Sequence, residues 1–307
     1  MKWKKLGLIF SVNNNYDWMY SHASMPFAEF TEDDIFKIYF SCRNKNNESS
    51  IGYVIIDLNN PQNILTISKE PVLSKGELGT FDDSGTMGCC ILNKGSKQYL
   101  YYIGWNLGVT VPFRNSIGLA ISKNNGMTYQ RAYNGPIIDR TKDEPHFTAS
   151  SSVIEDDGIY KIWYLSCTDW SDVDEKKVHN YHIKYAESDD GINWKRDGIV
   201  AIDYKDEYEY AISVPRVIKE NGVYKMWFSS RGTKYIPTYR IRYAESNDGI
   251  KWIRKDEEVG IDVSESGWDS EMICYPFVFD HKGKRYMIYN GNDYGKSGFG
   301  LAVLESD

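Results

Sequence analysis

The segment YKIWYLSC at 160–167, followed by IKYAESDDGINW at 183–194, is the clearest indication of the fold. Both segments recur in nearly the same form as YKMWFSSR at 224–231 and IRYAESNDGIKW at 241–252. Aromatic and β-branched residues favour strands. The Asp-Gly pair ahead of each tryptophan indicates a tight turn into a further strand.

The aromatic segment occurs five times, at steps of about sixty residues. The copies are FKIYFSCR, YLYYIGWN, YKIWYLSC, YKMWFSSR and YMIYNGND, and they begin at Phe36, Tyr99, Tyr160, Tyr224 and Tyr286. An apolar segment precedes each copy and a second strand-like segment follows it, so each repeat is expected to form four short strands. Five such units repeated radially predict an all-β, five-bladed β-propeller with four antiparallel strands per blade. A solenoid has shorter repeats, and a sandwich does not repeat at this period.

The two ends of the chain also fit a closed ring. The fifth repeat stops after its third strand, FGLAVLES, which begins at Phe299. The N-terminal segment WKKLGLIF at 3–10 matches the fourth-strand segments that begin at Trp194 and Trp252. We therefore expect residues 3–10 to supply the outer strand of the last blade and to leave no open seam. This makes residues 1–307 a single domain.

Composition excludes several classes of protein. The chain is 26% charged and 41% hydrophobic, which is typical of a globular protein. No apolar stretch approaches the ~20 residues of a membrane helix, and the N-terminus lacks a signal sequence, so we expect a cytoplasmic protein without a membrane partner. The net charge of −7 gives no reason to bind nucleic acid. The five cysteines form no CxxC motif, which argues against a disulfide framework and a zinc cluster.

Aromatic residues are abundant, with 24 Tyr, 9 Trp and 12 Phe. Their flat apolar faces and polar edges suit sugar rings, so the expected partner is a carbohydrate. The oligomeric state is left open. In a propeller, the start of each innermost strand and the end of each aromatic strand lie on the same face, around a central funnel. The polar and aromatic residues expected there are His22, Arg43, Asp82, Asp83, Trp105, Glu144, His146, Asp169, Glu209, Arg231, Asp269, Glu271 and Asn290.

Three of these carboxylates, Asp83, Glu209 and Glu271, lie at comparable offsets from their innermost strands. Glycosidic-bond chemistry needs one carboxylic acid to protonate the leaving oxygen and a carboxylate to activate water or to attack the anomeric carbon. We therefore predict that these three residues are the catalytic acid, base or nucleophile. The other ten residues are predicted to bind substrate. The alternative for any single carboxylate is a solvated loop residue.

Other chemistries are less consistent with the sequence. His22 and His146 could be metal ligands, but lone histidines on different strands more often form hydrogen bonds within a site. We expect no metal and no cofactor, although a structural ion in the central channel remains an option. The GKSGFG segment at 295–300 lacks the helix that a phosphate loop requires. Ser150–Ser152 lack a GxSxG elbow.

The combination of YKIWYLS-type strands with IKYAESDDGINW resembles the five-bladed glycosidase-like propellers. These include glycoside hydrolase families 32, 43, 62 and 68 and the mannoside phosphorylases of family 130, and the resemblance covers the whole chain. More narrowly, segments such as SHASMP and ESGWDSEMICYPFVFD resemble an uncharacterised bacterial group that tends to accompany genes for surface polysaccharides. The resemblance implies a glycosidase-like enzyme.

The catalytic residues of families 32 and 43 do not carry over to this chain. Those families place an acidic residue at or close before the innermost-strand proline of the first three blades. Here Met25 precedes Pro26, and Glu209 and Glu271 belong to the fourth and fifth repeats. The fold is therefore expected to be shared and the reaction is not transferred with it.

Three functions remain open at this point. The first is a carbohydrate-active enzyme that hydrolyses or transfers a glycosyl group. The second is a phosphorylase, or an enzyme acting on a phosphorylated or nucleotide-linked sugar, in which Arg43, Arg231 and His22 hold the phosphate. The third is a non-catalytic carbohydrate-binding propeller. Dependence on phosphate separates the first two, and saturable binding without turnover identifies the third.

Overall fold

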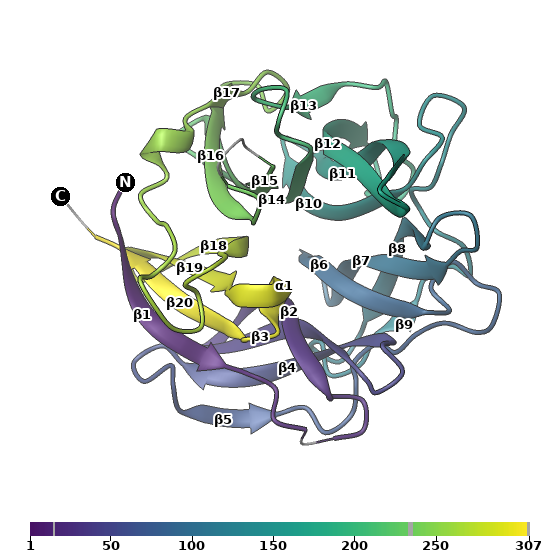
Figure 1. Cartoon of the computed structure of the whole chain (residues 1–307). Helices are drawn as coiled ribbons and strands as arrows, with labels where there is room; N and C mark the ends of the chain where they lie inside the picture. The colour runs from purple at the N-terminus through teal and green to yellow at the C-terminus, as the bar shows by residue number, and fades with distance from the viewer. Residues whose placement is uncertain (15, 233–235, 306–307) are drawn as a thin grey trace.

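The computed structural model describes residues 1–14, 16–232 and 236–305. Among these residues, the elements are strands β1 to β20, one 3₁₀ helix at Asp256–Glu258 and the four-residue helix α1 at Asn292–Gly295. The predicted all-β class is confirmed. Figure 1 shows the strands arranged around a common centre, with the two ends of the chain close together on the outside.

The strands pair in groups of four that follow the order of the chain. The first two groups are β2 (Ser21–Glu32), β3 (Ile35–Arg43), β4 (Ser49–Asp57) and β5 (Ile64–Ile67), then β6 (Gly85–Lys94), β7 (Lys97–Leu107), β8 (Phe113–Ser122) and β9 (Gln130–Arg131). The next two are β10 (Thr148–Asp156), β11 (Ile159–Val173), β12 (Lys176–Ser188) and β13 (Val200–Ile202), then β14 (Ala211–Glu220), β15 (Val223–Arg231), β16 (Arg240–Ser246) and β17 (Ile253–Arg254). The fifth joins β18 (Cys274–His281), β19 (Lys284–Asn290) and β20 (Phe299–Leu304) to β1 (Trp3–Phe10).

Pairing is antiparallel within each group. Single parallel bridges, Ser49 to Gly85 and Tyr181 to Ala211, connect neighbouring groups, so that the twenty strands form one four-stranded and two eight-stranded sheets. Apolar and aromatic side chains fill the space between the groups. The largest fully buried ones include Trp163, Trp227 and Tyr39.

The predicted pairing between the two ends of the chain is confirmed. In β1, Trp3 lies opposite Leu304 of β20, and Phe10 lies opposite Phe299. Trp3 is buried and packs edge-on against Trp227 of β15, with ring centroids 6.4 Å apart. The first strand of the chain therefore completes the last group and also packs against the group before it.

The repeated Ser-x-Asp-Gly segments connect neighbouring groups. The hydroxyl of Ser188 accepts the amide of Gly191 at 2.9 Å and fixes the turn, which needs glycine because φ is +76° there. The carbonyl of Gly191 accepts a hydrogen bond from the Tyr101 hydroxyl of the preceding group at 2.9 Å. In the next copy, the carbonyl of Gly249 accepts one from Trp163 Nε1 at 2.8 Å. The motif that predicted the repeat thus ties each unit to the previous one.

Replacing Trp3 tests the contribution of the N-terminal strand. We expect Trp3→Ala to lower the free energy of unfolding by about 3–5 kcal/mol, because a large buried ring is removed at the junction of two groups. The control is Lys4→Ala, since the neighbouring Lys4 is exposed. Chemical denaturation of both variants measures the difference. An unchanged midpoint for Trp3→Ala would show that β1 is dispensable for closing the sheet.

Candidate functional site

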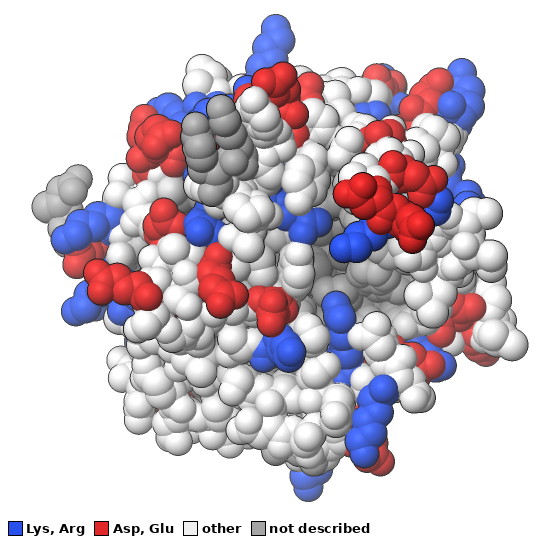
Figure 2. Space-filling view, in the orientation of Figure 1, with Lys and Arg blue, Asp and Glu red and all other residues white. Residues whose placement is uncertain are grey.

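A cavity of about 510 Å³ opens on the face where the ends of the aromatic strands meet. Figure 2 shows this face with a hollow near its centre and charged side chains around it. Residues of the first and second groups and of the loops beside them line the cavity. They are Ser24, Ser41, Arg43, Asn46, Asn47, Glu48, Ser49, Lys75, Leu78, Asp83, Ser84, Met87, Trp105, Leu107, Pro112 and Phe113.

Asp83 lines this cavity as an ionised carboxylate. Its Oδ1 accepts hydrogen bonds from Ser84 Oγ at 2.8 Å and from Asn106 Nδ2 at 3.0 Å, and its Oδ2 accepts the Gly79 amide at 3.0 Å. Desolvation raises the pKa of Asp83, but these hydrogen bonds together outweigh it and hold the pKa below its usual value. The group therefore suits a base, a nucleophile or an acceptor for sugar hydroxyls better than an acid.

Glu48 is a second carboxylate in the same cavity. It follows the end of β3 and accepts hydrogen bonds from Lys75 Nζ at 2.5 Å and from Asn44 Nδ2 at 2.9 Å. The Lys75 contact is the largest cause that lowers the pKa of Glu48. Sequence reasoning missed this residue, because it considered the approaches to the innermost strands and the strand ends but not the turn after β3. The polar run Asn44–Glu48 was the available signal.

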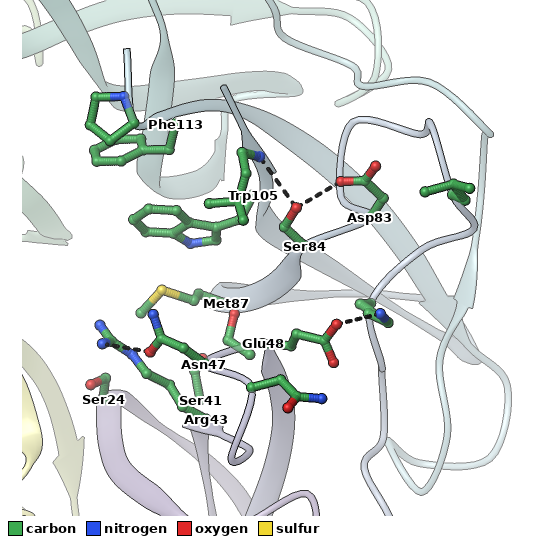
Figure 3. Close-up of a pocket in the computed structure, with 16 residues that line it drawn as sticks. Ser24, Ser41, Arg43, Asn47, Glu48, Asp83, Ser84, Met87, Trp105 and Phe113 are labelled. Carbon is green, nitrogen blue, oxygen red and sulfur yellow. Dashed lines mark hydrogen bonds and ion pairs between the residues drawn. The ribbon is translucent and has the colours of Figure 1, made fainter. Parts of the chain in front are cut away.

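The remaining wall combines a cation with aromatic rings. Arg43 ends β3 and donates to Asn47 Oδ1 at 3.2 Å, and no carboxylate among the described residues forms an ion pair with it. Trp105 lies two residues before the end of β7 and packs against Phe113, with ring centroids 4.7 Å apart. In Figure 3, Trp105 and Phe113 lie on one side of the cavity, and Arg43, Asn47 and Glu48 lie on the other. The structure thus brings together three predicted residues, Arg43, Asp83 and Trp105.

Four other predicted carboxylates are buried in ion pairs with a cation near the outer edge of their group. The pairs are Asp82 with Arg131 at 2.7 Å, Glu144 with Arg196 at 2.8 Å, Glu209 with Arg254 at 2.6 Å, and Asp269 with Lys5 at 2.7 Å. In three of the groups, a tyrosine of the aromatic strand also donates to the carboxylate. These tyrosines are Tyr102, Tyr164 and Tyr289. We call these four pairs the edge latches, because each holds the approach to an innermost strand against the outer edge.

Glu209 shows how fully such a carboxylate is occupied. Both of its oxygens accept hydrogen bonds from Arg254, and the Lys205 amide adds a third bond at 2.7 Å. Desolvation raises the pKa of Glu209, but the contacts with Arg254 outweigh it and lower the pKa. Glu209 is 3% exposed, whereas Glu271 is an exposed residue. Of the three predicted catalytic carboxylates, Asp83 is the one that lines the cavity.

Two further predicted residues have structural contacts of their own. Asn290 is fully buried, and its side chain accepts the Met25 amide at 2.8 Å and donates to the Ala23 carbonyl at 2.7 Å, which joins β19 to β2. Arg231 lies among tyrosine rings and donates to the Tyr294 hydroxyl at 2.5 Å. Both residues lie on the funnel side of their strands, and neither lines the 510 Å³ cavity.

The remaining predicted residues are two histidines and an aspartate. Desolvation, with repulsion from Arg43, lowers the pKa of His22 to about 4, so this side chain is neutral at pH 7. His146 is half-buried before β10. Asp169 accepts a hydrogen bond from the Thr168 hydroxyl at 3.3 Å. None of these three lines the cavity. Within the described part of the chain, no three His, Cys, Asp or Glu side chains come together in a way that could hold a metal ion.

A smaller cavity of about 120 Å³ continues from the first toward the centre of the molecule. The two cavities share Met87, Trp105 and Phe113. His179 also lines the inner cavity, and its ring lies 5.4 Å from Phe113. This aromatic lining, which sequence reasoning missed, makes the inner end of the site apolar.

Comparison with known structures defines the class of protein. The solved structure titled "Glycoside hydrolase" matches with a TM-score of 0.77 and 18% sequence identity, over 99% of this chain and 92% of the other. A thermostable family-43 glycoside hydrolase matches with a TM-score of 0.68 and 17% identity, over 97% of this chain and 94% of the other. The chain therefore has the glycoside hydrolase fold that the sequence resemblance predicted.

Sequence comparison then identifies the family. The chain belongs to the same family as "Uncharacterized protein Rv1502" of Mycobacterium tuberculosis (strain ATCC 25618 / H37Rv), with 45% identity over 306 residues and 100% of both chains covered. A more distant similarity, 28% identity over 144 residues, links 46% of this chain to 45% of a 1,2-beta-oligomannan phosphorylase of Thermoanaerobacter sp. (strain X514). No family model matches the chain.

Within residues 1–14, 16–232 and 236–305, no helix is both long enough and apolar enough to cross a membrane.

The variant Glu209→Gln separates a structural role from a catalytic one. We expect it to lower the free energy of unfolding by about 3 kcal/mol, because it breaks a buried ion pair. Because the pKa of Glu209 is lowered on folding, its stabilising effect is complete above its unfolded pKa of about 4.3 and is lost as the pH falls through the folded pKa. The difference in the free energy of unfolding between Glu209→Gln and the wild type should therefore become smaller at acidic pH.

The matched control is Glu207→Gln, which makes the same change of charge two residues away at an exposed position. Thermal and urea denaturation between pH 3 and pH 7 give the comparison. If Glu209→Gln keeps the stability of the wild type but abolishes turnover, the catalytic prediction for Glu209 is correct and the latch is not its role.

Proposed function

We propose that this protein is a carbohydrate-active enzyme that transfers or hydrolyses a glycosyl group in the 510 Å³ cavity. The observation that carries the proposal is the lining of this cavity. It combines the ionised Asp83 and Glu48 and the cation Arg43 with the aromatic surface of Trp105 and Phe113. Aromatic rings bind the apolar face of a sugar, and charged groups bind its hydroxyls.

We also propose that the five groups of four strands are the blades of a five-bladed propeller that forms a single domain. The antiparallel pairing inside each group and the pairing of β1 with β20 support this count. In this arrangement the cavity lies between the first two blades, at the rim of the central channel.

In the proposed reaction, Asp83 is the base or nucleophile. Its low pKa keeps it ionised, and the hydrogen bonds from Ser84 and Asn106 orient it. Glu48, which is also ionised, binds substrate hydroxyls beside Lys75. The edge latches, including Glu209, hold the strand ends in place and do not touch the substrate. Glu271 is assigned no part in the reaction because it does not line the cavity.

A second candidate function is phosphorolysis, or reaction of a sugar that carries a phosphate leaving group. Arg43 supports it, because this half-buried cation has no ion-pair partner among the described carboxylates. An ordinary glycosidic bond needs a general acid to protonate the leaving oxygen. Both carboxylates of the cavity are held ionised, which favours a glycosyl phosphate as the donor, because its phosphate leaves as an anion without being protonated. In phosphorolysis, phosphate is the nucleophile and the departing sugar oxygen must still be protonated, so inorganic phosphate itself would have to donate that proton. The distant similarity to a 1,2-beta-oligomannan phosphorylase is consistent with this candidate.

Turnover by Asp83→Asn tests the proposal. The protein is incubated with a panel of glycosides, oligosaccharides, sugar phosphates and nucleotide sugars, with and without inorganic phosphate, and products are measured by mass spectrometry. We expect the variant to lose about 10²–10⁴-fold in kcat, as is typical when a general base is removed. The wild type should keep its activity to lower pH than an enzyme with an unperturbed aspartate, because the pKa of Asp83 is lowered.

The control variant is Glu77→Gln, an exposed position in the loop that leads to Asp83. Its turnover should match that of the wild type. Products that form only in the presence of inorganic phosphate would indicate phosphorolysis. Saturable binding of a sugar without turnover by the wild type across the whole panel would reject the enzyme in favour of a carbohydrate-binding propeller.

A further inference from the structure

The lip of the 510 Å³ cavity carries unusually exposed apolar side chains. Leu78 is 98% exposed and Leu107 is 70% exposed, and both line the cavity. Val109, two residues beyond Leu107, is fully exposed. Large aliphatic side chains held in water are costly, since each forgoes the favourable burial of its apolar surface. Two of the three lie at the opening itself.

The turn that carries two of these side chains does not need them. It connects β7 to β8, and the Gly108 amide closes it by donating to the Pro112 carbonyl at 3.2 Å. The corresponding turn of the first group reads NKNNE at 44–48, and that of the third group reads DVDEKK at 172–177. Both are dominated by charged or amide side chains. The apolar residues at 107–112 are therefore a property of this cavity rather than of the fold.

The apolar lip continues into the cavity along one wall. Pro112, Phe113, Trp105 and Met87 line that wall, and the Trp105 and Phe113 rings are in contact. Arg43, Asn47 and Glu48 occupy the opposite wall (Figure 3). The cavity therefore has a polar half and an apolar half, and the apolar half leads out to Leu78 and Leu107. A free sugar would satisfy the polar half and leave the lip in water.

We propose that the ligand is an amphiphilic glycoside, in which a sugar lies between the polar wall and the Trp105 ring, and a hydrocarbon chain attached to it runs from Phe113 and Pro112 across Leu78 and Leu107. The inference rests on the proposed sugar site and specifies its substrate class. A hydrocarbon substituent covers the exposed lip side chains, and a neighbouring sugar keeps its hydroxyls against Asp83, Glu48 and Arg43. A glycoside with a polar aglycone does not provide this cover.

The test is a series of n-alkyl glucosides and n-alkyl mannosides with chains of four to eight carbons, measured by calorimetry below their micelle concentrations. We expect the affinity of the wild type to rise about fourfold for each methylene that is fully buried, as burial of hydrocarbon predicts. In the double variant Leu78→Ser/Leu107→Ser the increment should fall to about 1.3-fold or less. The control is Ile253→Ser, at a 69% exposed position on β17. It should keep the wild-type increment.

Three results would overturn the inference. The first is a wild-type affinity that does not change with chain length. The second is a dimer, detected by light scattering, that the double variant dissolves, because the lip then covers a second copy of the chain. The third is equal binding to glycoside-free phosphatidylcholine vesicles, because the lip then contacts a membrane. A chain-length increment without turnover by any panel substrate would reject the enzyme and keep the amphiphilic ligand, so the two failures are distinguishable.

Discussion

One buried ion pair recurs through the molecule and constrains the shape of the site. It joins a carboxylate just before an innermost strand to a cation near the outer edge of the same group. Asp82, Glu144, Glu209 and Asp269 form this contact in four groups. Removing one partner of a buried ion pair leaves the other charge unpaired and strongly destabilises the fold. Each pair therefore holds the inner and outer edges of its group together. In the described part of the first group no such pair is formed, and Trp18 Nε1 donates to the Lys69 carbonyl at 2.9 Å.

This constraint decides which polar groups remain for a ligand. Carboxylates that are buried against a cation from the outer edge of their group are part of the scaffold. Asp83, directly after the latched Asp82, has a carboxylate that faces the cavity, and Glu48 and Arg43 come from the turn and strand end of the first group. The candidate site is thus asymmetric in a molecule built from repeats, and it lies between the first and second groups. Its apolar wall comes from the second group, with Met87 from β6, Trp105 from β7, and Pro112 and Phe113 at the start of β8.

Much of the fold could be predicted because it follows from periodicity. The five aromatic strands, the Asp-Gly turns and the match of residues 3–10 to the outer strands all follow from local sequence, and the pairing of β1 with β20 is as expected. The site was predicted less well. Arg43, Asp83 and Trp105 do line the cavity, but Glu209 and Glu271 do not, and Glu48, Phe113 and His179 were missed.

By itself, the sequence determined the strand repeat, the all-β class and the set of residues near the strand ends. The spacing of apolar residues along a strand and the residue types in a turn are local properties, so they can be recognised without knowledge of tertiary contacts. Which carboxylates are not neutralised by a buried cation depends on contacts between distant parts of the chain. Asp82 and Asp83 are adjacent in sequence, but Asp82 is fully buried against Arg131, 49 residues away, and Asp83 lines the cavity. The reason is physical: a carboxylate is neutralised by whichever cation the folded chain brings to it, and that partner lies far away in the sequence.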